Sequence, residues 1–250
     1  MFRFFTASRK RERRPAALPR DLRVYAIGDV HGRADLLAAL HARIEADASR
    51  APQPRKHVIY LGDYIDRGPS SREVVEMLLS RPLAGVSATH LLGNHEAMLL
   101  QFLDDVACGP EWLAFGGLET LLSYGVASAG TGRYEERLLA AQQSLRQRLP
   151  EAHRRFLVGL PRSIVLGDYM FVHAGVRPGV MLERQSDTDL IWIRREFLES
   201  TVFHGKVVVH GHSFMTEPEI LPNRIGIDTG AYATGRLTCL VLEGDEIRFL

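Results

Sequence analysis

Three largely apolar runs near the start of the chain each end in a short polar cluster that opens a stretch with helical spacing. The runs cover residues 24–27, 58–61 and 89–92. Strands that alternate with loops and helices in this way are typical of a parallel sheet in an α/β protein. In such sheets, ligands bind at the carboxyl ends of the strands. The pattern therefore predicts that the three polar clusters lie at one edge of a sheet and form a site.

The middle of the chain has a different pattern. Residues 104–160 carry leucines and Trp112 at helical spacing, with glycine and proline as interruptions. This pattern predicts a helical insertion within the α/β protein. Two roles are open for such an insertion: it is plain structural cover, or it shapes the substrate site.

From residue 163 onward, the sequence pattern predicts short strands that alternate with turns. Residues 163–166 and 169–173 flank Gly167-Asp168, which is a hairpin signal. Further short strands are expected at 206–210, 224–228, 236–242 and 246–250. Together with the first three strands, they predict two mixed β-sheets face to face with helices outside. This domain is expected to span residues 21–250.

Composition agrees with an ordinary globular protein of 250 residues, of which 46% are hydrophobic and 24% are charged. The charge is unevenly distributed. Residues 1–20 carry seven arginines and lysines against Glu12, a net +6, so the other 230 residues carry −5 of the total of +1. A mildly acidic body does not favour nucleic-acid binding, and we expect no nucleic-acid partner.

The basic segment 1–20 is expected to be a solvated, disordered arm. The alternative is a weak membrane-surface or partner-docking segment, because Phe2, Phe4 and Phe5 lie beside its arginines. No run approaches the roughly 18 apolar residues of a membrane span, and no signal peptide is recognisable. Cys108 and Cys239 lie in apolar surroundings and are expected to be buried, reduced thiols. These features predict a cytoplasmic protein without integral membrane association.

Candidate metal ligands stand at five predicted strand ends, each tucked against a glycine: Asp29 with His31, Asp63, Asn94, His173 and His212. Divalent ions such as Mn²⁺ and Fe²⁺ accept this mixture of carboxylate, amide and imidazole ligands. The glycines permit tight turns that aim the side chains inward. One Gly-Asp pair is usually only a turn. Five such clusters in order predict a metal centre.

The same clusters resemble the signature motifs of the PPP-type phosphoprotein phosphatases. Gly28-Asp29-Val30-His31-Gly32, Gly62-Asp63-Tyr64-Ile65-Asp66-Arg67-Gly68 and Gly93-Asn94-His95-Glu96 match three motifs in order and rough spacing. His173-Ala174-Gly175 and Gly211-His212 resemble two later histidine motifs. The similarity covers roughly residues 23–243 and is greatest to the small bacterial and phage-lambda-type serine/threonine protein phosphatases. The resemblance implies a calcineurin-like metallophosphoesterase fold.

The resemblance also implies how two metal ions are held. Asp29, His31 and Asp63 would bind one ion. Asp63 would bridge to a second ion bound by Asn94, His173 and His212, while His210 is left out of the set. Manganese is the metal that the resemblance favours, and Fe²⁺ or Zn²⁺ would also suit these ligands. A hydroxide shared by the two ions would attack phosphorus directly.

The leaving alkoxide needs a proton, and His95 is the candidate general acid because it follows the ligand Asn94 without being a ligand. Asp66 would accept a hydrogen bond from the other ring nitrogen of His95 and so fix its tautomer. The family resemblance assigns this pair the same roles.

Two arginines are expected to hold the phosphate. Arg67 matches a phosphate-binding arginine of the family. Residues 190–195 resemble the tryptophan-x-arginine segment of the phage-type enzymes, which implies Arg194, although Arg195 is its neighbour. Tyr232 either lines the pocket or packs in a turn.

These residues predict a metal-dependent phosphoprotein phosphatase that acts on phosphoserine or phosphothreonine and, as small members of the family vary, on phosphotyrosine. Its partner is then a phosphorylated protein.

The alternative is a nucleotide phosphohydrolase similar to the symmetrical diadenosine tetraphosphatases. These share the opening motif, both later histidine motifs and the Asp-Thr-Gly stretch that begins at Asp228. They often lack the second aspartate of the middle motif and read GNHD, so Asp66 and Glu96 favour the phosphatase. A scaffold that has lost its chemistry is disfavoured because every ligand position and His95 are filled.

Overall fold

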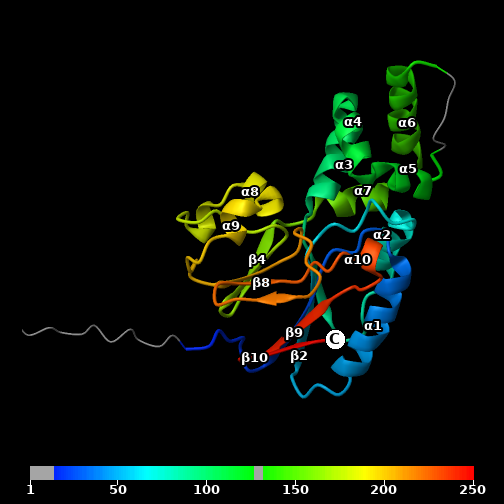
Figure 1. Ribbon diagram of the computed structural model, residues 1–250. Helices are drawn as coiled ribbons and strands as arrows, with labels where there is room; N and C mark the ends of the chain where they lie inside the picture. The colour runs from blue at the N-terminus through cyan, green and yellow to red at the C-terminus, as the bar shows by residue number, and fades with distance from the viewer. Residues whose placement is uncertain (1–13, 127–131) are drawn as a thin grey trace, which may run out of the picture.

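The computed structural model describes residues 14–126 and 132–250. Two five-stranded sheets lie against each other, and helices cover the outer faces (Figure 1). Apolar side chains of both sheets, among them Ala26, Ile59, Phe171 and Val209, form one buried cluster between them. The expected α/β fold with two mixed sheets between helices is confirmed.

The first sheet has the strand order β10-β9-β1-β2-β3. Strands β1, β2 and β3 are parallel, and β9 and β10 form an antiparallel hairpin beside β1. Tyr60 at the end of β2 is level with Ile27 on β1 and with His90 on β3. The loops that follow these three strands therefore meet at one edge. The strands are β1 (Leu22–Ile27), β2 (Arg55–Tyr60), β3 (Ser87–His90), β9 (Cys239–Glu243) and β10 (Glu246–Phe249).

The second sheet has the order β4-β5-β6-β8-β7. Strands β5, β6 and β8 are parallel, and β4 pairs with β5 through the expected hairpin turn at Gly167-Asp168. Its parallel strands also end at the edge where the site lies. The strands are β4 (Ser163–Leu166), β5 (Tyr169–Val172), β6 (Val207–His210), β7 (Glu219–Ile220) and β8 (Arg224–Gly226).

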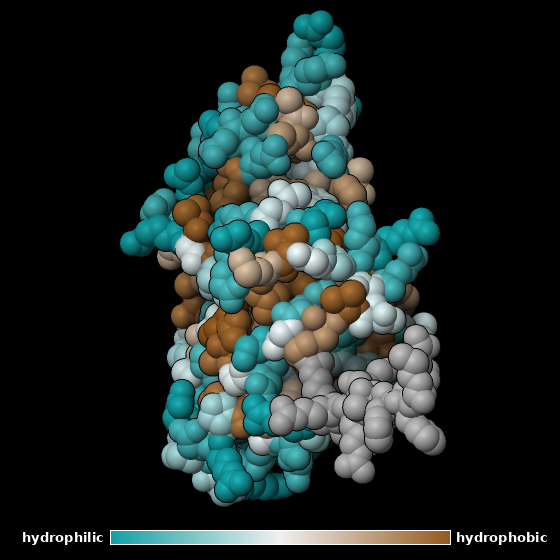
Figure 2. Space-filling model, turned by 90° about the vertical axis from the view of Figure 1, so that its left-hand side faces the viewer, coloured by the Kyte–Doolittle hydropathy of each residue, from teal (hydrophilic) through white to brown (hydrophobic). Residues whose placement is uncertain are grey.

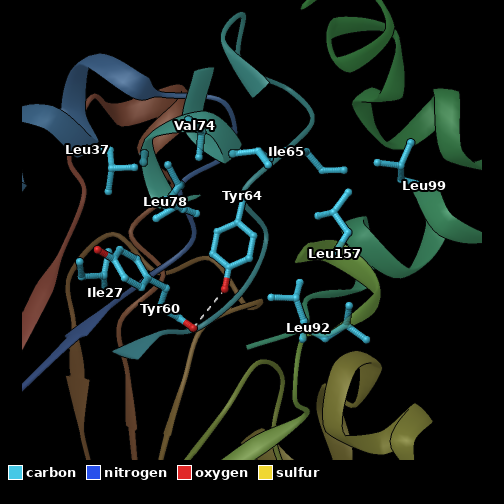
Figure 3. Close-up of a cluster of buried hydrophobic side chains, with 14 of the residues drawn as sticks. Ile27, Leu37, Tyr60, Tyr64, Ile65, Val74, Leu78, Leu92, Leu99 and Leu157 are labelled. Atoms are coloured by element: carbon cyan, nitrogen blue, oxygen red, sulfur yellow. Dashed lines mark hydrogen bonds between the residues drawn. The ribbon is translucent and has the colours of Figure 1, made fainter. Parts of the chain in front are cut away.

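Helices pack on the outer face of the first sheet and form the main hydrophobic core. Figure 3 shows Ile27 and Tyr60 of this sheet near Leu37 and Leu78, while Leu99 lies at the other side of the cluster near Leu157. The apolar residues of the helices recur at helical spacing, so each helix buries one side against the strands. The helices concerned are α1 (Ala34–Ala48), α2 (Ser71–Ser80), α3 (Asn94–Asp104) and α7 (Glu151–Val158).

The segment expected as a helical insertion consists of helices and turns in its described part. It contains a turn, residues 113–117, that lies between two short helices and kinks at Gly116, where the backbone is not helical. In Figure 1 these elements stand together above the carboxyl ends of the first sheet. They are η1 (Val106–Cys108), α4 (Gly109–Trp112), η2 (Leu113–Gly117), α5 (Leu118–Ser123) and α6 (Tyr134–Arg148).

Four short elements of the C-terminal half were not expected from the sequence. They are η3 (Leu182–Arg184), α8 (Asp187–Trp192), α9 (Arg195–Leu198) and α10 (Ala231–Thr234). Each has at most six residues, which is too short for an apolar periodicity to show.

Residues 14–20, which the sequence places in the N-terminal arm, are described by the structure and contact the sheets. Leu18 is buried between the sheets. Its backbone N–H donates to Gly244 O (2.7 Å), and Asp168 N donates to Ala17 O (3.0 Å). The segment is held because it runs between the turns of two hairpins and buries an apolar side chain there. The rest of the expected arm, residues 1–13, lies outside the described residues.

The two cysteines differ in exposure. Cys239 is buried, as expected, whereas Cys108 is partly exposed. The prediction for Cys108 was wrong because the short helix η1 holds it at the surface of the helical segment.

Figure 2 shows the face on the side of the second sheet, where apolar residues gather among hydrophilic ones. A pocket of about 500 Å³ is lined by the starts of β5 and β6, by β7 and β8, and by residues 14–16. It lies at the opposite end of β5 and β6 from His173 and His212, so it is separate from the candidate site. No helix in the described part of the chain is long and apolar enough to span a bilayer. Cytoplasmic location stays a prediction.

Candidate metal centre

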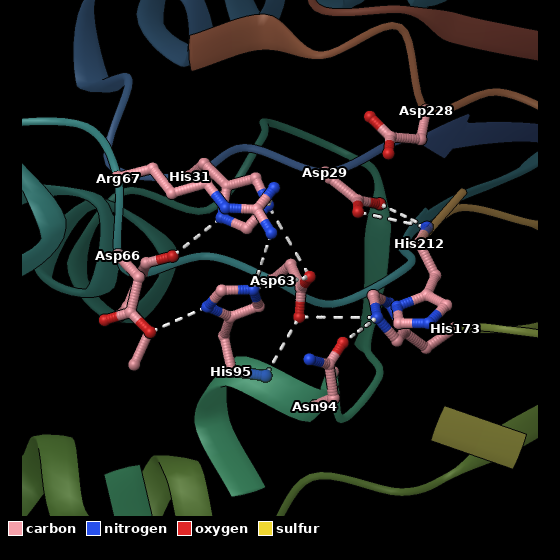
Figure 4. A network of polar contacts seen from close by, with 12 residues as sticks. Asp29, His31, Asp63, Asp66, Arg67, Asn94, His95, His173, His212 and Asp228 are labelled. Atoms are coloured by element: carbon pink, nitrogen blue, oxygen red, sulfur yellow. Dashed lines mark hydrogen bonds and ion pairs between the residues drawn. The ribbon is translucent and has the colours of Figure 1, made fainter. Parts of the chain in front are cut away.

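All six predicted metal ligands meet at the carboxyl ends of the parallel strands (Figure 4). The loop after β1 supplies two of them, the loop after β2 one, and the first residue of α3 another. The remaining two follow β5 and β6. Each is at most 6% exposed to solvent, and together they are Asp29, His31, Asp63, Asn94, His173 and His212.

Asp63 lies in the middle of this group. Its Oδ1 is 3.3 Å from His173 Nε2, and its Oδ2 is 3.6 Å from His31 Nε2. Two His/Asp clusters that could hold a metal ion share Asp63. One adds His31 and His95, the other His173 and His212, and the ligand atoms of each cluster lie within 4.8 Å of one another. A carboxylate shared between two clusters could bridge a pair of ions. Asp29 belongs to neither of these two clusters, and His95 takes its place beside His31 and Asp63.

The histidine rings are fixed from behind by backbone carbonyls. His31 Nδ1 lies 2.9 Å from Ile65 O, and His173 Nδ1 lies 2.8 Å from Leu61 O. A neutral ring that donates through Nδ1 directs the lone pair of Nε2 into the site. There His173 Nε2 faces Asn94 Oδ1 at 2.9 Å as well as Asp63. These close contacts need a proton or a metal ion among the three atoms, so the set of ligand atoms fits a cation.

The electrostatics of these side chains show the same need for positive charge. Burial alone would lower the pKa of His173, but Asp63 raises it to about 9. Burial and the nearby Asp228 raise the pKa of Asp29 well above its usual range. A proton on His173 thus supplies part of the charge that these carboxylates require, and a divalent ion would supply more.

Strained backbone aims the side chains. Left-handed φ values cost about 1–3 kcal/mol each at residues other than glycine. Among the described residues, every such residue belongs to the site motifs: His31, Asp63, Asp66, Arg67 and His212. Their surroundings hold them in this conformation, as is usual at functional sites.

Two glycines leave space for the carboxylates. A Cβ atom on Gly93 would lie 2.2 Å from Asp63 Oδ1, and one on Gly211 would lie 2.1 Å from Asp29 Oδ1. Asp29 in turn accepts hydrogen bonds from the backbone N–H of His212 at 3.0 and 3.2 Å. Any larger residue at these glycines would displace a candidate ligand.

His95 and Asp66 form a buried pair beside the clusters. His95 Nδ1 lies 2.7 Å from Asp66 Oδ2, and its Nε2 is 3.7 Å from Asp63 Oδ2. Burial lowers the pKa of His95, but Asp63 and Asp66 together raise it above its ordinary value. The structure thus places Nε2 of His95 toward the centre, where a proton would be delivered.

Both expected arginines reach the site. Arg67 donates to His31 Nε2 at 3.0 Å, and its Nη2 lies 3.1 Å from His95 Nε2. Arg194 Nε donates to His212 Nε2 at 2.9 Å. Arg195 is exposed and pairs with Glu199, so the structure brings Arg194, and not its neighbour, to the site.

Aromatic rings stand around the same histidines. Tyr232 meets His31 edge-on at 5.5 Å between ring centroids, and the Arg67 guanidinium lies 5.0 Å from the centroid of Tyr232. Tyr232 thus borders the site, which agrees with the expectation that it lines the pocket. Phe115 meets His95 edge-on at 6.2 Å.

Glu96 has a structural position that its motif alone did not reveal. Its carboxylate accepts backbone N–H groups of Asp63 (2.9 Å), Tyr64 (2.7 Å) and Gly93 (3.0 Å). It therefore ties the loop after β2 to the start of α3 and keeps Asp63 beside Asn94.

Asp228 was missed as a member of the site. It is buried near Asp29 and follows β8, so the rule of strand ends could have found it. His210, left out on sequence grounds, is buried on β6 with its Nδ1 against Gly211 O. Its Nε2 lies near Gly226, away from the clusters.

Comparison with known proteins adds family information. A family model described as calcineurin-like phosphoesterase matches residues 22–241. The asymmetrical bis(5'-nucleosyl)-tetraphosphatase PrpE of Anoxybacillus flavithermus is 26% identical over 86% of this chain and 88% of its own length. The enzyme of that name from Halalkalibacterium halodurans is 27% identical over 86% and 87%. A symmetrical bis(5'-nucleosyl)-tetraphosphatase from Klebsiella pneumoniae is 44% identical, but over only 30% of this chain.

Solved structures share the fold. A candidate diadenosine tetraphosphatase has a TM-score of 0.61 at 24% identity, covering 91% of this chain and 92% of its own. A cold-active protein tyrosine phosphatase has 0.56 at 16%, covering 94% and 81%. A serine/threonine phosphatase from Saccharomyces cerevisiae has 0.55 at 14%, covering 94% and 83%. The specific likeness to phage-lambda-type phosphatases stays a prediction, since these curated relatives are tetraphosphatases.

Proposed function

This chain belongs to the calcineurin-like phosphoesterase family, and on that premise we propose that it hydrolyses phosphate monoesters of phosphoproteins. Hydrolysis of a phosphoester with the help of divalent metal follows from the family. The substrate class does not, because the relatives include enzymes named for dinucleotides and structures named for phosphoproteins.

The observation that supports a phosphomonoester is the His95–Asp66 pair at 2.7 Å. Serine, threonine and tyrosine are poor leaving groups, and the phenol of tyrosine has a pKa of about 10. They must be protonated as they depart, and a positioned acid contributes about 10²–10⁴-fold. A nucleotide leaves through a phosphate group whose second pKa is about 6, so it departs without a proton donor. A buried, oriented acid therefore suits alcohol and phenol esters.

The remaining roles follow from position. Asp29, His31 and Asp63 would hold one divalent ion, and Asp63, Asn94, His173 and His212 would hold a second. Such ions, when bound, acidify water and neutralise charge on phosphoryl oxygens. Manganese is our proposal for the metal.

Arg67 and Arg194 would bind the phosphate oxygens, Arg67 from the cluster that contains His31 and Arg194 from the cluster that contains His212. Each guanidinium lies against imidazole nitrogens of the site, Arg67 beside His31 and His95 and Arg194 beside His212. Planar guanidinium groups bind phosphate through two parallel hydrogen bonds. His95 Nε2, on the Arg67 side, would then hold its proton at the leaving oxygen.

A second candidate is the hydrolysis of dinucleoside tetraphosphates. It is favoured by the PrpE relatives, which match this chain over most of both lengths. In this case His95 and Asp66 would orient the phosphate more than protonate a leaving group.

A substrate panel separates the candidates. Metal-depleted protein is restored with Mn²⁺, Fe²⁺ or Zn²⁺ and assayed on phosphoserine, phosphothreonine and phosphotyrosine peptides beside diadenosine tetraphosphate. We expect the highest kcat/KM on a phosphopeptide, with an Asp63→Asn preparation as the background. A large preference for the dinucleotide would overturn the proposal.

A further inference from the structure

We propose that Thr120 and Trp112 are positioning residues that hold the Asp66 carboxylate against His95. Both belong to the helical insertion within residues 104–160, called the helical segment below. The inference rests on the proposed role of His95 as a general acid. It assigns to the helical segment a part in catalysis beyond cover.

Both oxygens of Asp66 receive a hydrogen bond from this segment. Thr120 Oγ1 donates to Oδ1 at 2.5 Å, and Trp112 Nε1 donates to Oδ2 at 2.9 Å. The same Oδ2 takes the bond from His95 at 2.7 Å. With both oxygens fixed, the carboxylate cannot turn away from the imidazole.

Thr120 also fixes the backbone of Asp66. Its Oγ1 accepts the Asp66 N–H at 2.9 Å, beside Ser71 Oγ at 3.0 Å from the same N–H. Asp66 has a left-handed φ of 70°, which for aspartate needs support from its surroundings. One hydroxyl thus holds both the main chain and the side chain of this residue.

Asp66, Trp112 and Thr120 have no exposed surface. An ionised carboxylate away from water is stable only if donors surround it. Trp112 and Thr120 are two of these donors, and they belong to a segment separated from Asp66 by about 50 residues. The charge that orients His95 therefore depends on how the helical segment docks.

The turn at residues 113–117, which kinks at Gly116, brings the backbone of this segment to the neighbouring arginine. Gly116 O accepts the N–H of Arg67 at 3.1 Å. Gly116 has a φ of 104°, and a Cβ there would lie 2.8 Å from Arg67 N. The turn follows Trp112 directly, so one short stretch contacts both the acid pair and the phosphate-binding candidate.

The test compares Thr120→Val, which keeps the shape and loses the hydroxyl, with Thr120→Ser, which keeps the hydroxyl. Each is assayed on phenyl phosphate, a poor leaving group, and on p-nitrophenyl phosphate, an activated one. We expect Thr120→Val to lower kcat on phenyl phosphate about tenfold, as for one lost hydrogen bond to a charged group. On the activated ester the loss is less than about threefold, because little protonation is needed. KM stays unchanged, and Thr120→Ser retains parental rates.

Ser123→Ala is the matched control. Ser123 lies on the same helix α5, and its hydroxyl contacts Thr120 O and Arg72 N. We expect parental rates from it on both esters. Trp112→Phe keeps the ring against Phe102 and loses only the N–H, so it repeats the test if Thr120→Val does not fold.

A double-mutant cycle completes the test. In an Asp66→Asn background, Thr120→Val should cause no further loss that depends on the leaving group. Equal losses on both esters from Thr120→Val and from Trp112→Phe, or full additivity with Asp66→Asn, would overturn the inference.

His95→Asn separates the two proposals. If it loses rate equally on both esters, the acid role itself fails. If it shows the dependence and the Thr120 and Trp112 variants do not, only the positioning inference fails.

Discussion

Asp66 accepts the Nδ1–H of His95 at 2.7 Å, and neither residue is open to solvent beyond 1%. Asp66→Asn removes the charge while keeping the shape. We expect kcat on phenyl phosphate to fall about 10–100-fold, since the imidazole loses a charge-assisted bond and its preferred protonated form. Bound metal, measured by elemental analysis, should equal that of the parent. Loss of metal together with rate would show that Asp66 acts on the clusters instead.

The neighbouring arginines provide a matched pair. Arg194 donates to His212 at the site, whereas Arg195 pairs with Glu199 at the surface. We expect Arg194→Ala to lower kcat/KM about 10–100-fold by removing a charge-assisted contact to phosphate. Arg195→Ala should retain the parental value. Similar kcat/KM values for the two variants would refute the assignment.

Gly211→Ala should displace Asp29, a proposed metal ligand, without removing any polar group. Its Cβ would lie 2.1 Å from Asp29 Oδ1, too close for any contact. We expect elemental analysis to find fewer ions per chain and kcat to fall with them. Gly159→Ala, at the end of α7 with an ordinary backbone conformation, serves as the control. A Gly211→Ala protein with full metal content and rate would exclude Asp29 from the ligand set.

Glu96 is predicted to govern stability more than substrate choice. It holds backbone N–H groups of two loops from a buried position. Glu96→Asp should lower the free energy of unfolding by about 2–4 kcal/mol, because a buried donor loses its partner. The ratio of kcat/KM between a phosphopeptide and diadenosine tetraphosphate should stay the same. Glu73→Asp, on the exposed side of α2, is the control for the melting measurement. A changed substrate ratio would return Glu96 to the role of a specificity residue.

The fold and the convergence of the six candidate ligands could be predicted because both depend on local patterns. Apolar runs define the strands, and parallel pairing brings the ends of those strands to one edge. Asp228 follows the same rule and could have been included.

Other features depend on contacts between distant segments. The donors to Asp66 come from about 50 residues further along the chain. The burial of Leu18 depends on two hairpin turns from the C-terminal half. The choice of Arg194 over Arg195 depends on how one loop runs past His212. No local periodicity records such pairings, so the sequence pattern left them open.

In the sequence, Asp66 and Glu96 are the two residues that favour a phosphoprotein substrate over a nucleotide. In the structure, only Asp66 lies where it could affect the reaction. Asp66 lies in the acid pair, so it bears on the leaving group. Glu96 accepts backbone N–H groups of the loop after β2. A glutamate in place of the aspartate of the tetraphosphatases therefore concerns how this loop is held, and not the substrate. The proposal for phosphoproteins therefore depends on the acid pair.

Leaving-group dependence of kcat in His95→Asn tests the acid role most directly. The parent and the variant are assayed on aryl phosphates whose phenols range from activated to poor, with metal content matched. We predict a loss of about 10²–10⁴-fold on the poorest leaving group, and less than about tenfold on the most activated one. An equal loss across the series would contradict the acid role and, with it, the case for a phosphomonoester substrate.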